Sequence, residues 1–345
     1  MIMFNPDYLV RPNVKALVPY LCARDEFQGK EGVFLDANEN PYGYLNRYPD
    51  PYQRDLKIAI SKLRKIPAER IFLGNGSDEI IDLTFRIFCN PGIDKALTFS
   101  PSYGMYQVSA SVNDVQIIKI PLNKDFQIDF EDVSSHLSDK NLKLILICSP
   151  NNPTGNSMNR QTVERIISQF QGVVLVDEAY MDFSDKPSLL EKIADYPNLI
   201  VMQTFSKAFG LASVRVGVAY TSPEIVAYYN KMKPPYNIST INQKAVLQKL
   251  TKFSAYTGQI RKIKKERERL SRELENIPVI QKVYPSDANF VLVKVEDSGK
   301  LYNYLVDNGI VVRNRHSVID NCIRITVGTR AENSKLLYAL NNFGK

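Results

Sequence analysis

The sequence offers little that would bind a structural metal or span a membrane. Its four cysteines, Cys22, Cys89, Cys148 and Cys322, are widely separated, with no CxxC pair and no neighbouring histidine. This spacing argues against a metal site and predicts free, buried thiols. No apolar stretch approaches the roughly 20 residues of a membrane-spanning helix, and the N-terminal residues lack the continuous apolar core of a signal peptide. We therefore expect a protein of a reducing compartment, most simply the cytoplasm.

A concentration of charge of one sign is also missing. The formal charge of +7 comes from 44 basic and 37 acidic side chains spread along the chain, which is too diffuse to predict a nucleic-acid surface. Anionic small molecules are the ligands that this balance favours. The longest charged stretch, from Arg261 to Leu274, mixes both signs and carries apolar residues at helical spacing. It predicts the solvated face of a long amphipathic helix.

The chain does contain enough apolar material for a large core, with 345 residues of which 44% are hydrophobic. From about residue 70 onward, short apolar runs alternate with stretches of helical periodicity. The runs are continuous, which indicates strands covered on both faces; they are IFLGNG, KALTFS, VQIIKI, LKLILICSP, GVVLVDEAY, NLIVMQTFS and VRVGVAYTS. This pattern predicts an α/β domain with a mostly parallel seven-stranded sheet flanked by helices.

The pattern changes after residue 250, where fewer and alternating strands precede a closing helix from about residue 331 to 343. This change predicts a smaller α+β domain. We assign residues 40–250 to the large domain and residues 1–39 and 251–345 to the small one.

A lysine, Lys207, follows one of the apolar runs. Taken alone, a lysine at such a position is most often a surface residue. A partly desolvated lysine near other cations, however, favours its neutral amine, which is the form that attacks an aldehyde to give a Schiff base. Ligands bind beyond the carboxyl ends of parallel strands, so this position makes Lys207 a candidate nucleophile.

Three further residues lie at similar strand ends. Asp177 ends a run that is otherwise entirely apolar, so it is either a cap or a buried anion that awaits a cation such as a protonated pyridine nitrogen. Tyr180 and Asn152 have side chains that could donate hydrogen bonds to a ring oxygen. The NPTG stretch that contains Asn152 is also a credible turn on structural grounds alone.

Two segments have the composition of an anion site. The GNGSDE stretch lies between a predicted strand and a helix, where backbone N–H groups and the helix dipole face an anion. Arg215 and the hydroxyls of Thr204 and Ser206 supply complementary donors, and Tyr103 offers an aromatic face on which a planar ring can stack. Pyridoxal 5'-phosphate is the one cofactor that needs all of these groups together.

The ordered set Asn152, Asp177, Tyr180, Lys207 and Arg215 resembles the fold-type-I pyridoxal-phosphate aminotransferases. Further stretches are similar to the histidinol-phosphate aminotransferase family along nearly the whole chain, namely RPNVKALVPY, LDANENPYG, LNRYPDP, GNGSDEIIDL, YPSDANFVLVK and IRITVGTRAEN. The resemblance implies reversible transamination between L-histidinol phosphate and 2-oxoglutarate, giving imidazole acetol phosphate and L-glutamate, in histidine biosynthesis.

The same resemblance implies a role for each matching residue. Lys207 would form the Schiff base and move the proton, Asp177 would pair with the ring nitrogen, and Asn152 and Tyr180 would bind the ring oxygen. Tyr103 would stack on the ring. The residues implied around the cofactor phosphate are Gly76, Ser77, Asp78, Thr204, Ser206, Arg215 and, from the other subunit of a homodimer, Tyr48. The residues implied for substrate are Tyr20, Asn40, Arg313 and Arg324, and no metal is implied.

Some alternatives stay open at this point. An additional arginine, Arg315, could share or replace the role of Arg313 in binding the substrate phosphate. A threonine-phosphate decarboxylase or an aromatic amino-acid aminotransferase would keep the same cofactor residues. From a different class, the chain could be a non-catalytic module that binds the cofactor or a ligand.

Overall fold

A computed structural model describes residues 5–19 and 32–344. Its larger sheet has the strand order β1-β7-β6-β5-β4-β2-β3. The strands are β1 (Ile71–Gly74), β2 (Lys95–Ser100), β3 (Gln116–Pro121), β4 (Leu142–Cys148), β5 (Val173–Asp177), β6 (Leu199–Thr204) and β7 (Gly217–Tyr220). Only β7 runs antiparallel to its neighbours, β1 and β6. The predicted mostly parallel, seven-stranded sheet is confirmed.

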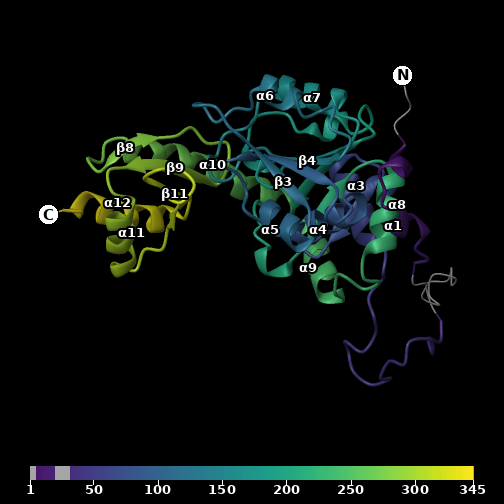
Figure 1. Cartoon of the computed structure of the whole chain (residues 1–345). Helices are drawn as coiled ribbons and strands as arrows, with labels where there is room; N and C mark the ends of the chain where they lie inside the picture. Colours follow the sequence, from purple (N-terminus) through teal and green to yellow (C-terminus); the bar gives the residue numbers. More distant parts are fainter. Residues whose placement is uncertain (1–4, 20–31, 345) are drawn as a thin grey trace.

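Helices cover both faces of this sheet (Figure 1), as the buried strands require. One apolar cluster joins the sheet to α3 (Arg54–Arg64), α6 (Phe130–Ser134), α7 (Arg160–Gln169) and α9 (Thr240–Leu250). The cluster on the other face joins it to α4 (Ser77–Phe88), α5 (Met105–Val112) and α8 (Pro223–Met232). Single turns of 3-10 helix connect these elements at Ala68–Arg70, Met181–Phe183, Leu189–Lys192 and Ala212–Val214.

A second sheet forms the core of the small domain. Its four strands are antiparallel in the order β10-β11-β9-β8. They are β8 (Ile280–Val283), β9 (Phe290–Val295), β10 (Arg313–Asn314) and β11 (Cys322–Thr326), and they pack against α11 (Ser298–Asp307) and α12 (Arg330–Asn342). Thr329 and Glu332 form a capping box at the start of α12, which fixes where the closing helix begins.

The long amphipathic helix α10 (Phe253–Leu274) joins the two domains. Tyr256, near its start, belongs to the apolar cluster of the large domain, whereas Leu274, at its end, belongs to that of the small domain. Between them, Arg267 donates hydrogen bonds to the carbonyl oxygens of Phe183 and Ala288, at 3.3 and 2.8 Å. We infer that the domain boundary lies within α10.

The N-terminal segment packs on the large domain, whereas the predicted division placed residues 1–39 with the small one. Val10 and Val14, on either side of the start of α1 (Pro12–Ala16), are buried in the cluster that contains α4 and α8. Arg11 N also donates to Ile87 O at 3.0 Å. The large domain therefore buries two apolar side chains that the predicted division assigned to the small domain.

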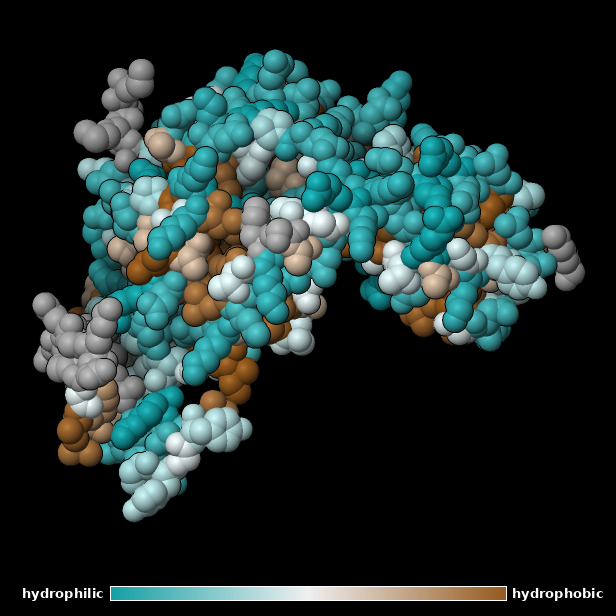
Figure 2. All heavy atoms as spheres, turned by 180° about the vertical axis from the view of Figure 1, so that it is seen from behind, coloured by the Kyte–Doolittle hydropathy of each residue, from teal (hydrophilic) through white to brown (hydrophobic). Residues whose placement is uncertain are grey.

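Residues 32–47 form an extended arm that stands away from the body of the large domain (Figures 1 and 2), and the chain rejoins that body at Tyr48, which stacks on Tyr236, and at the buried Pro51. Cys89, Cys148 and Cys322 are buried free thiols, as predicted, while Cys22 lies outside the described residues. Within residues 5–19 and 32–344, no helix has the length and apolar character to cross a bilayer.

Candidate active site

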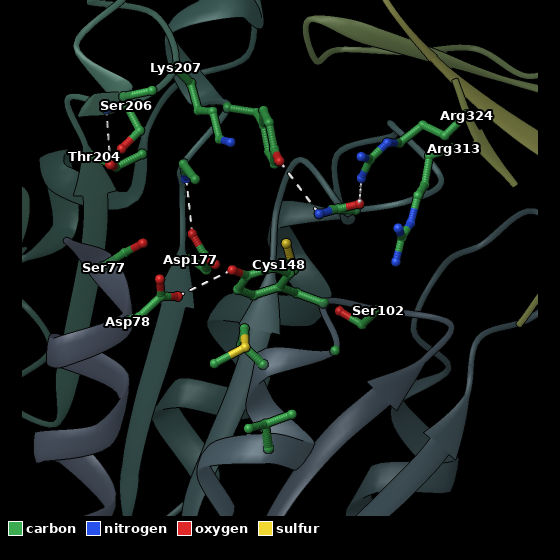
Figure 3. A pocket seen from close by; sticks show the side chains of 18 of the residues that line it. Ser77, Asp78, Ser102, Cys148, Asp177, Thr204, Ser206, Lys207, Arg313 and Arg324 are labelled. Atoms are coloured by element: carbon green, nitrogen blue, oxygen red, sulfur yellow. Dashed lines mark hydrogen bonds between the residues drawn. The ribbon is translucent and has the colours of Figure 1, made fainter. Parts of the chain in front are cut away.

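A cavity of about 570 Å³ opens at the carboxyl ends of β4, β5 and β6 (Figure 3). The N-terminus of α4 borders it on one side, and arginines from the small domain reach into it from the other. The predicted site residues that line it are Ser77, Asp78, Tyr103, Asn152, Asp177, Tyr180, Thr204, Ser206, Lys207, Arg215, Arg313 and Arg324.

Lys207 lies in the turn that follows β6, three residues beyond Thr204. Its Nζ is 5.9 Å from the centre of the Tyr180 ring. Desolvation and the positive charges of Arg324 and Arg215 lower the pKa of Lys207, against the opposing effect of Asp177. The lowered pKa increases the fraction of neutral amine, which is the nucleophilic form.

Asp177 occupies the last position of β5 and is only 4% exposed. Its carboxylate accepts hydrogen bonds from Tyr106 Oη at 2.9 Å and from Ala179 N at 3.0 Å. Burial raises the pKa of Asp177 to about 6, and these two donors moderate the rise by stabilising the anion. The result is a carboxylate suited to pairing with a cationic group in the cavity.

Asn152, Tyr180 and Arg324 form a chain of hydrogen bonds (Figure 3). Arg324 Nη1 donates to Asn152 Oδ1 at 2.5 Å, and Asn152 Nδ2 lies 3.4 Å from Tyr180 Oη. Burial raises the pKa of Tyr180 well above its usual value, so its hydroxyl remains a donor at neutral pH. The chain connects the large-domain wall of the cavity to the small domain.

The N-terminus of α4 and Arg215 face each other across a space that depends on Gly76. Gly76 has φ +82°, and a Cβ there would come within 2.5 Å of Arg215 Nη2. Arg215 itself has φ 53° and extends to Ser206 Oγ at 3.3 Å and to the Asp78 carboxylate at 3.2 Å. Backbone N–H groups and a guanidinium thus converge as they do in phosphate-binding sites.

Two more side chains complete this region. Thr204 Oγ1 accepts a hydrogen bond from Ser206 N at 3.1 Å, which fixes the turn before Lys207. Tyr103 Oη donates to Asp78 Oδ1 at 3.2 Å, and its ring meets that of Tyr106 edge to face at 5.6 Å. These contacts hold the Tyr103 ring at the cavity wall.

Three arginines form the small-domain side of the cavity. Arg313 on β10 and Arg324 on β11 lie opposite each other in the strand register, and Arg315 follows two residues after Arg313. Desolvation lowers the pKa of Arg324, with a further contribution from Arg313. The cavity wall as a whole carries five basic side chains and two carboxylates, so it attracts anions.

Asn40 and Tyr48 are not brought to this cavity in the single chain. Asn40 and Tyr48 line a separate cavity of about 800 Å³ along the extended arm. There Asn40 Oδ1 accepts from Tyr42 N at 2.9 Å, and Tyr48 stacks on Tyr236 with ring centroids 4.4 Å apart. Tyr20 lies outside the described residues.

Sequence reasoning missed Tyr106, which holds Asp177 from helix α5. The signal was present in the stretch SPSYGMY, where Tyr106 follows Tyr103 by one helical turn, but the contact with Asp177 spans 71 positions. The cavity is also lined by Ser102, Met105, Val108 and Cys148, which no sequence motif predicted as site residues.

The residues present fit the predicted cofactor. A lysine with a lowered pKa, a buried carboxylate, an aromatic side wall and an anion cradle surround one cavity. In the described ranges, no cluster of three or more His, Cys, Asp or Glu side chains could hold a metal ion. The chemistry of this donor set is therefore that of an organic cofactor with a phosphate group.

Comparison with known proteins places this cavity in context. The model of the family "Aminotransferase class I and II" matches residues 33–340. The histidinol-phosphate aminotransferase of Cytophaga hutchinsonii is 50% identical, with 99% of each chain covered. The crystal structure of the histidinol-phosphate aminotransferase from Clostridium acetobutylicum aligns with a TM-score of 0.80 at 30% identity, covering 86% of this chain and 90% of that one. That from Sinorhizobium meliloti, in complex with pyridoxal 5'-phosphate, aligns with a TM-score of 0.78 at 25% identity, covering 86% and 82%.

Proposed function

The chain belongs to the aminotransferase class I and II family, and on that premise we propose that it is a histidinol-phosphate aminotransferase. It transfers an amino group reversibly between L-histidinol phosphate and 2-oxoglutarate, giving imidazole acetol phosphate and L-glutamate, as a step of histidine biosynthesis. The observation that carries the proposal is the 50% identity to a relative of that name over 99% of both chains. The anion-attracting cavity around Lys207 supports it.

The cofactor is pyridoxal 5'-phosphate, which supplies an aldehyde for amino-group transfer and a ring that withdraws electrons from the substrate. Lys207 would bind the aldehyde carbon and Asp177 would hold the ring nitrogen. Tyr180 and Asn152 would orient the ring oxygen, and Tyr103 would cover the ring face. The phosphate would be held by Gly76, Ser77, Asp78, Thr204, Ser206 and Arg215.

The mechanism assigned to the chain's own residues is proton transfer combined with anion binding. Lys207 Nζ removes the proton from Cα of the amino donor in one half-reaction and delivers a proton to Cα of the keto acceptor in the other, a role that its lowered pKa favours. Asp177 keeps a proton on the group it faces, because a buried carboxylate stabilises a neighbouring cation. Arg324 and Arg313 bind the substrate anions through guanidinium forks.

The protein is further proposed to be a homodimer in which Tyr48 of the partner subunit reaches the cofactor phosphate. The extended arm supports this, since Val33, Leu35, Tyr42 and Tyr44 are each at least 84% exposed. Apolar side chains gathered on one exposed segment mark an interaction surface. Asn40, which lies on the same arm, would meet the substrate in the dimer.

A complementation experiment tests this arrangement. Lys207→Ala and Tyr48→Phe homodimers are each expected to be impaired, and a hybrid of the two chains contains one site with both native residues. Mixing the variants after reversible dissociation should therefore restore activity. A mixture that gives only the average of the two variants, despite chain exchange verified by mass spectrometry, would contradict the shared site.

The substrate assignment is tested by a coupled assay with purified holoenzyme. L-Histidinol phosphate with 2-oxoglutarate is expected to give the highest kcat/KM, ahead of phenylalanine with the same acceptor. Threonine phosphate is expected to release no carbon dioxide. Preference for phenylalanine would indicate an aromatic aminotransferase, and carbon dioxide release without keto-acid consumption would indicate a decarboxylase.

We also infer a cytoplasmic location from the three buried free thiols, since reduced cysteines are typical of reducing compartments. Cell fractionation should place the protein with cytosolic markers.

A further inference from the structure

Arg315 is fixed by its backbone at the edge of the cavity. It lies one residue beyond β10, where its N donates to Cys322 O at 2.8 Å. Its carbonyl oxygen accepts hydrogen bonds from Val318 N and Ile319 N, both at 2.9 Å. Because both backbone groups are bonded, the base of the Arg315 side chain has a defined position at the cavity wall.

The Nε–H of the Arg315 guanidinium has no bonding partner that would explain its buried placement within residues 5–19 and 32–344. Desolvation lowers the pKa of Arg315, and the positive charges of Arg324 and Arg313 lower it further. A buried N–H without an acceptor and a cation beside two others are both unfavourable, so this arrangement is stabilised when an anion enters the cavity.

Two of the other cavity arginines have side-chain partners in the large domain. Arg215 is paired with Asp78, and Arg324 Nη1 donates to Asn152 next to Tyr180. Arg324 thereby links the small domain to the large-domain wall of the cavity. Arg313 and Arg315 lie at the start of the small-domain hairpin, where they would meet the distal end of a substrate whose amino group is at Lys207.

We propose that Arg315 is a specificity-determining residue that binds the phosphate of the phosphorylated substrate together with Arg313. This inference rests on the proposed function and adds the residue that selects for the phosphate. A guanidinium binds a phosphate dianion through parallel, charge-assisted hydrogen bonds. The same site gives no advantage to the dephosphorylated amino alcohol, which carries no anion at that end.

The first test compares L-histidinol phosphate with L-histidinol as amino donors for the holoenzyme. Arg315→Gln is expected to lower kcat/KM for histidinol phosphate by about 10- to 100-fold, the range for a charged hydrogen bond, through KM and with little change in kcat. The kcat/KM for histidinol, which carries no phosphate, should not fall in parallel. Arg315→Lys keeps the charge without the fork and should recover part of the loss.

The matched control is Lys300→Gln, which removes one positive charge from α11 of the same domain without touching the cavity. It should leave both substrates unaffected. An equal loss for histidinol phosphate and histidinol in Arg315→Gln would show a merely structural role and overturn the proposal. Unchanged kinetics for histidinol phosphate would overturn it as well.

Calorimetric titration of the holoenzyme with inorganic phosphate separates this proposal from the proposed function. The cofactor phosphate already fills the cradle at Arg215, so added phosphate reports on the arginines of the small domain. Wild-type protein and Lys300→Gln should bind it, and Arg315→Gln should bind it at least tenfold more weakly, as expected for the loss of a charged hydrogen bond. If wild type does not turn over histidinol phosphate, the proposed function fails, while this titration still decides the role of Arg315.

Discussion

The two ends of the cavity differ in how their charged groups are satisfied. At the large-domain end, Asp177 accepts two hydrogen bonds, and Asp78 is bonded to both Tyr103 and Arg215. At the small-domain end, the buried Nε atoms of Arg315 and Arg324 have no hydrogen-bond partner among the described residues. One end is preorganised by the protein, and the other depends on an incoming anion.

This difference matches the demands of a cofactor and of two alternating substrates. A resident cofactor is best held by groups that are already oriented, since little reorganisation is then needed at each turnover. A site that must accept a phosphate in one half-reaction and a carboxylate in the other cannot be matched in advance to either. Guanidinium groups whose Nε–H is still unbonded suit that second task because they bind both kinds of anion.

Removal of the reacting group at the preorganised end should have the largest effect. Lys207→Ala is expected to reduce kcat by at least about 10⁴-fold, since it removes both the nucleophile and the proton carrier. Lys207→Arg should be equally inactive, because a guanidinium stays protonated. Steady-state assays with matched thermal unfolding curves would check this, and near-native turnover by either variant would refute the assignment.

Loss of the buried carboxylate should come next. Asp177→Asn is expected to lower kcat by about 10²- to 10³-fold, as when one preorganised electrostatic group is lost from an active site. An amide cannot stabilise a protonated ring nitrogen as a carboxylate does. Absorbance spectra of the bound cofactor should change with the variant, and a spectrum and kcat like those of wild type would argue against the pairing.

The same carboxylate should give the cofactor-free protein a characteristic pH dependence. The folded-state pKa of Asp177, about 6, is above its unfolded value of 3.8, so the folded state binds the proton more tightly. Stability from this group is therefore present below about pH 4 and lost as pH rises through 6, by about 3 kcal/mol. Denaturant unfolding of the wild type and of Asp177→Asn across this pH range gives the difference in their free energies of unfolding. That difference should not change with pH if Asp177 has an ordinary pKa.

A smaller effect is expected when the predicted phosphate site between Gly76 and Arg215 is narrowed. Gly76→Ala places a methyl group against Arg215 at φ 82° and ψ 167°, a backbone region that is open essentially to glycine alone and costs other residues about 1–3 kcal/mol. Unfolding free energy and cofactor affinity should both decrease. Gly258→Ala is the control, since a Cβ there meets nothing within 4 Å and alanine favours a helix interior.

The most subtle test concerns the support of Asp177. Tyr106→Phe removes one of its two donors. In the pH profile of kcat/KM, the pKa of the acid limb should therefore rise by about one unit, the equivalent of one hydrogen bond to a charge. Tyr229→Phe, a buried tyrosine bonded to Thr84 outside the cavity, should leave the profile in place. An unshifted profile in Tyr106→Phe would show that the Tyr106 hydrogen bond does not support Asp177. The large-domain end of the cavity would then be less preorganised than its contacts indicate.

Much of the architecture could be predicted because most strands of the large sheet are continuous, buried apolar runs; the edge strand β3, in which only Ile120 is buried, is the exception to the predicted covering of both faces. β5 and β6 are buried along their whole length, so their apolar runs predicted strands of a covered parallel sheet. Because parallel strands end at one edge, the same runs also predicted that Lys207 and Asp177 would meet. The structure places both at one cavity.

Contacts that depend on packing between distant elements could not be predicted. Tyr106 reaches Asp177 only because α5 packs at one particular position along the strands of the sheet. Neither local periodicity nor motif spacing encodes that position. The packing of Val10 and Val14 was missed for a similar reason, because a short apolar segment does not indicate which of two cores it will join. Asn40 lies on the extended arm and Tyr48 where that arm rejoins the large domain, and a single chain does not determine their burial.

Helix α10 has a mechanical consequence. With 22 residues it is a rod about 33 Å long, and each end is embedded in a different core. Tyr256 on this rod stacks on Phe209, two residues beyond Lys207, with ring centroids 4.0 Å apart. One continuous helix therefore links the turn that carries Lys207 to the core of the domain that carries Arg313 and Arg324.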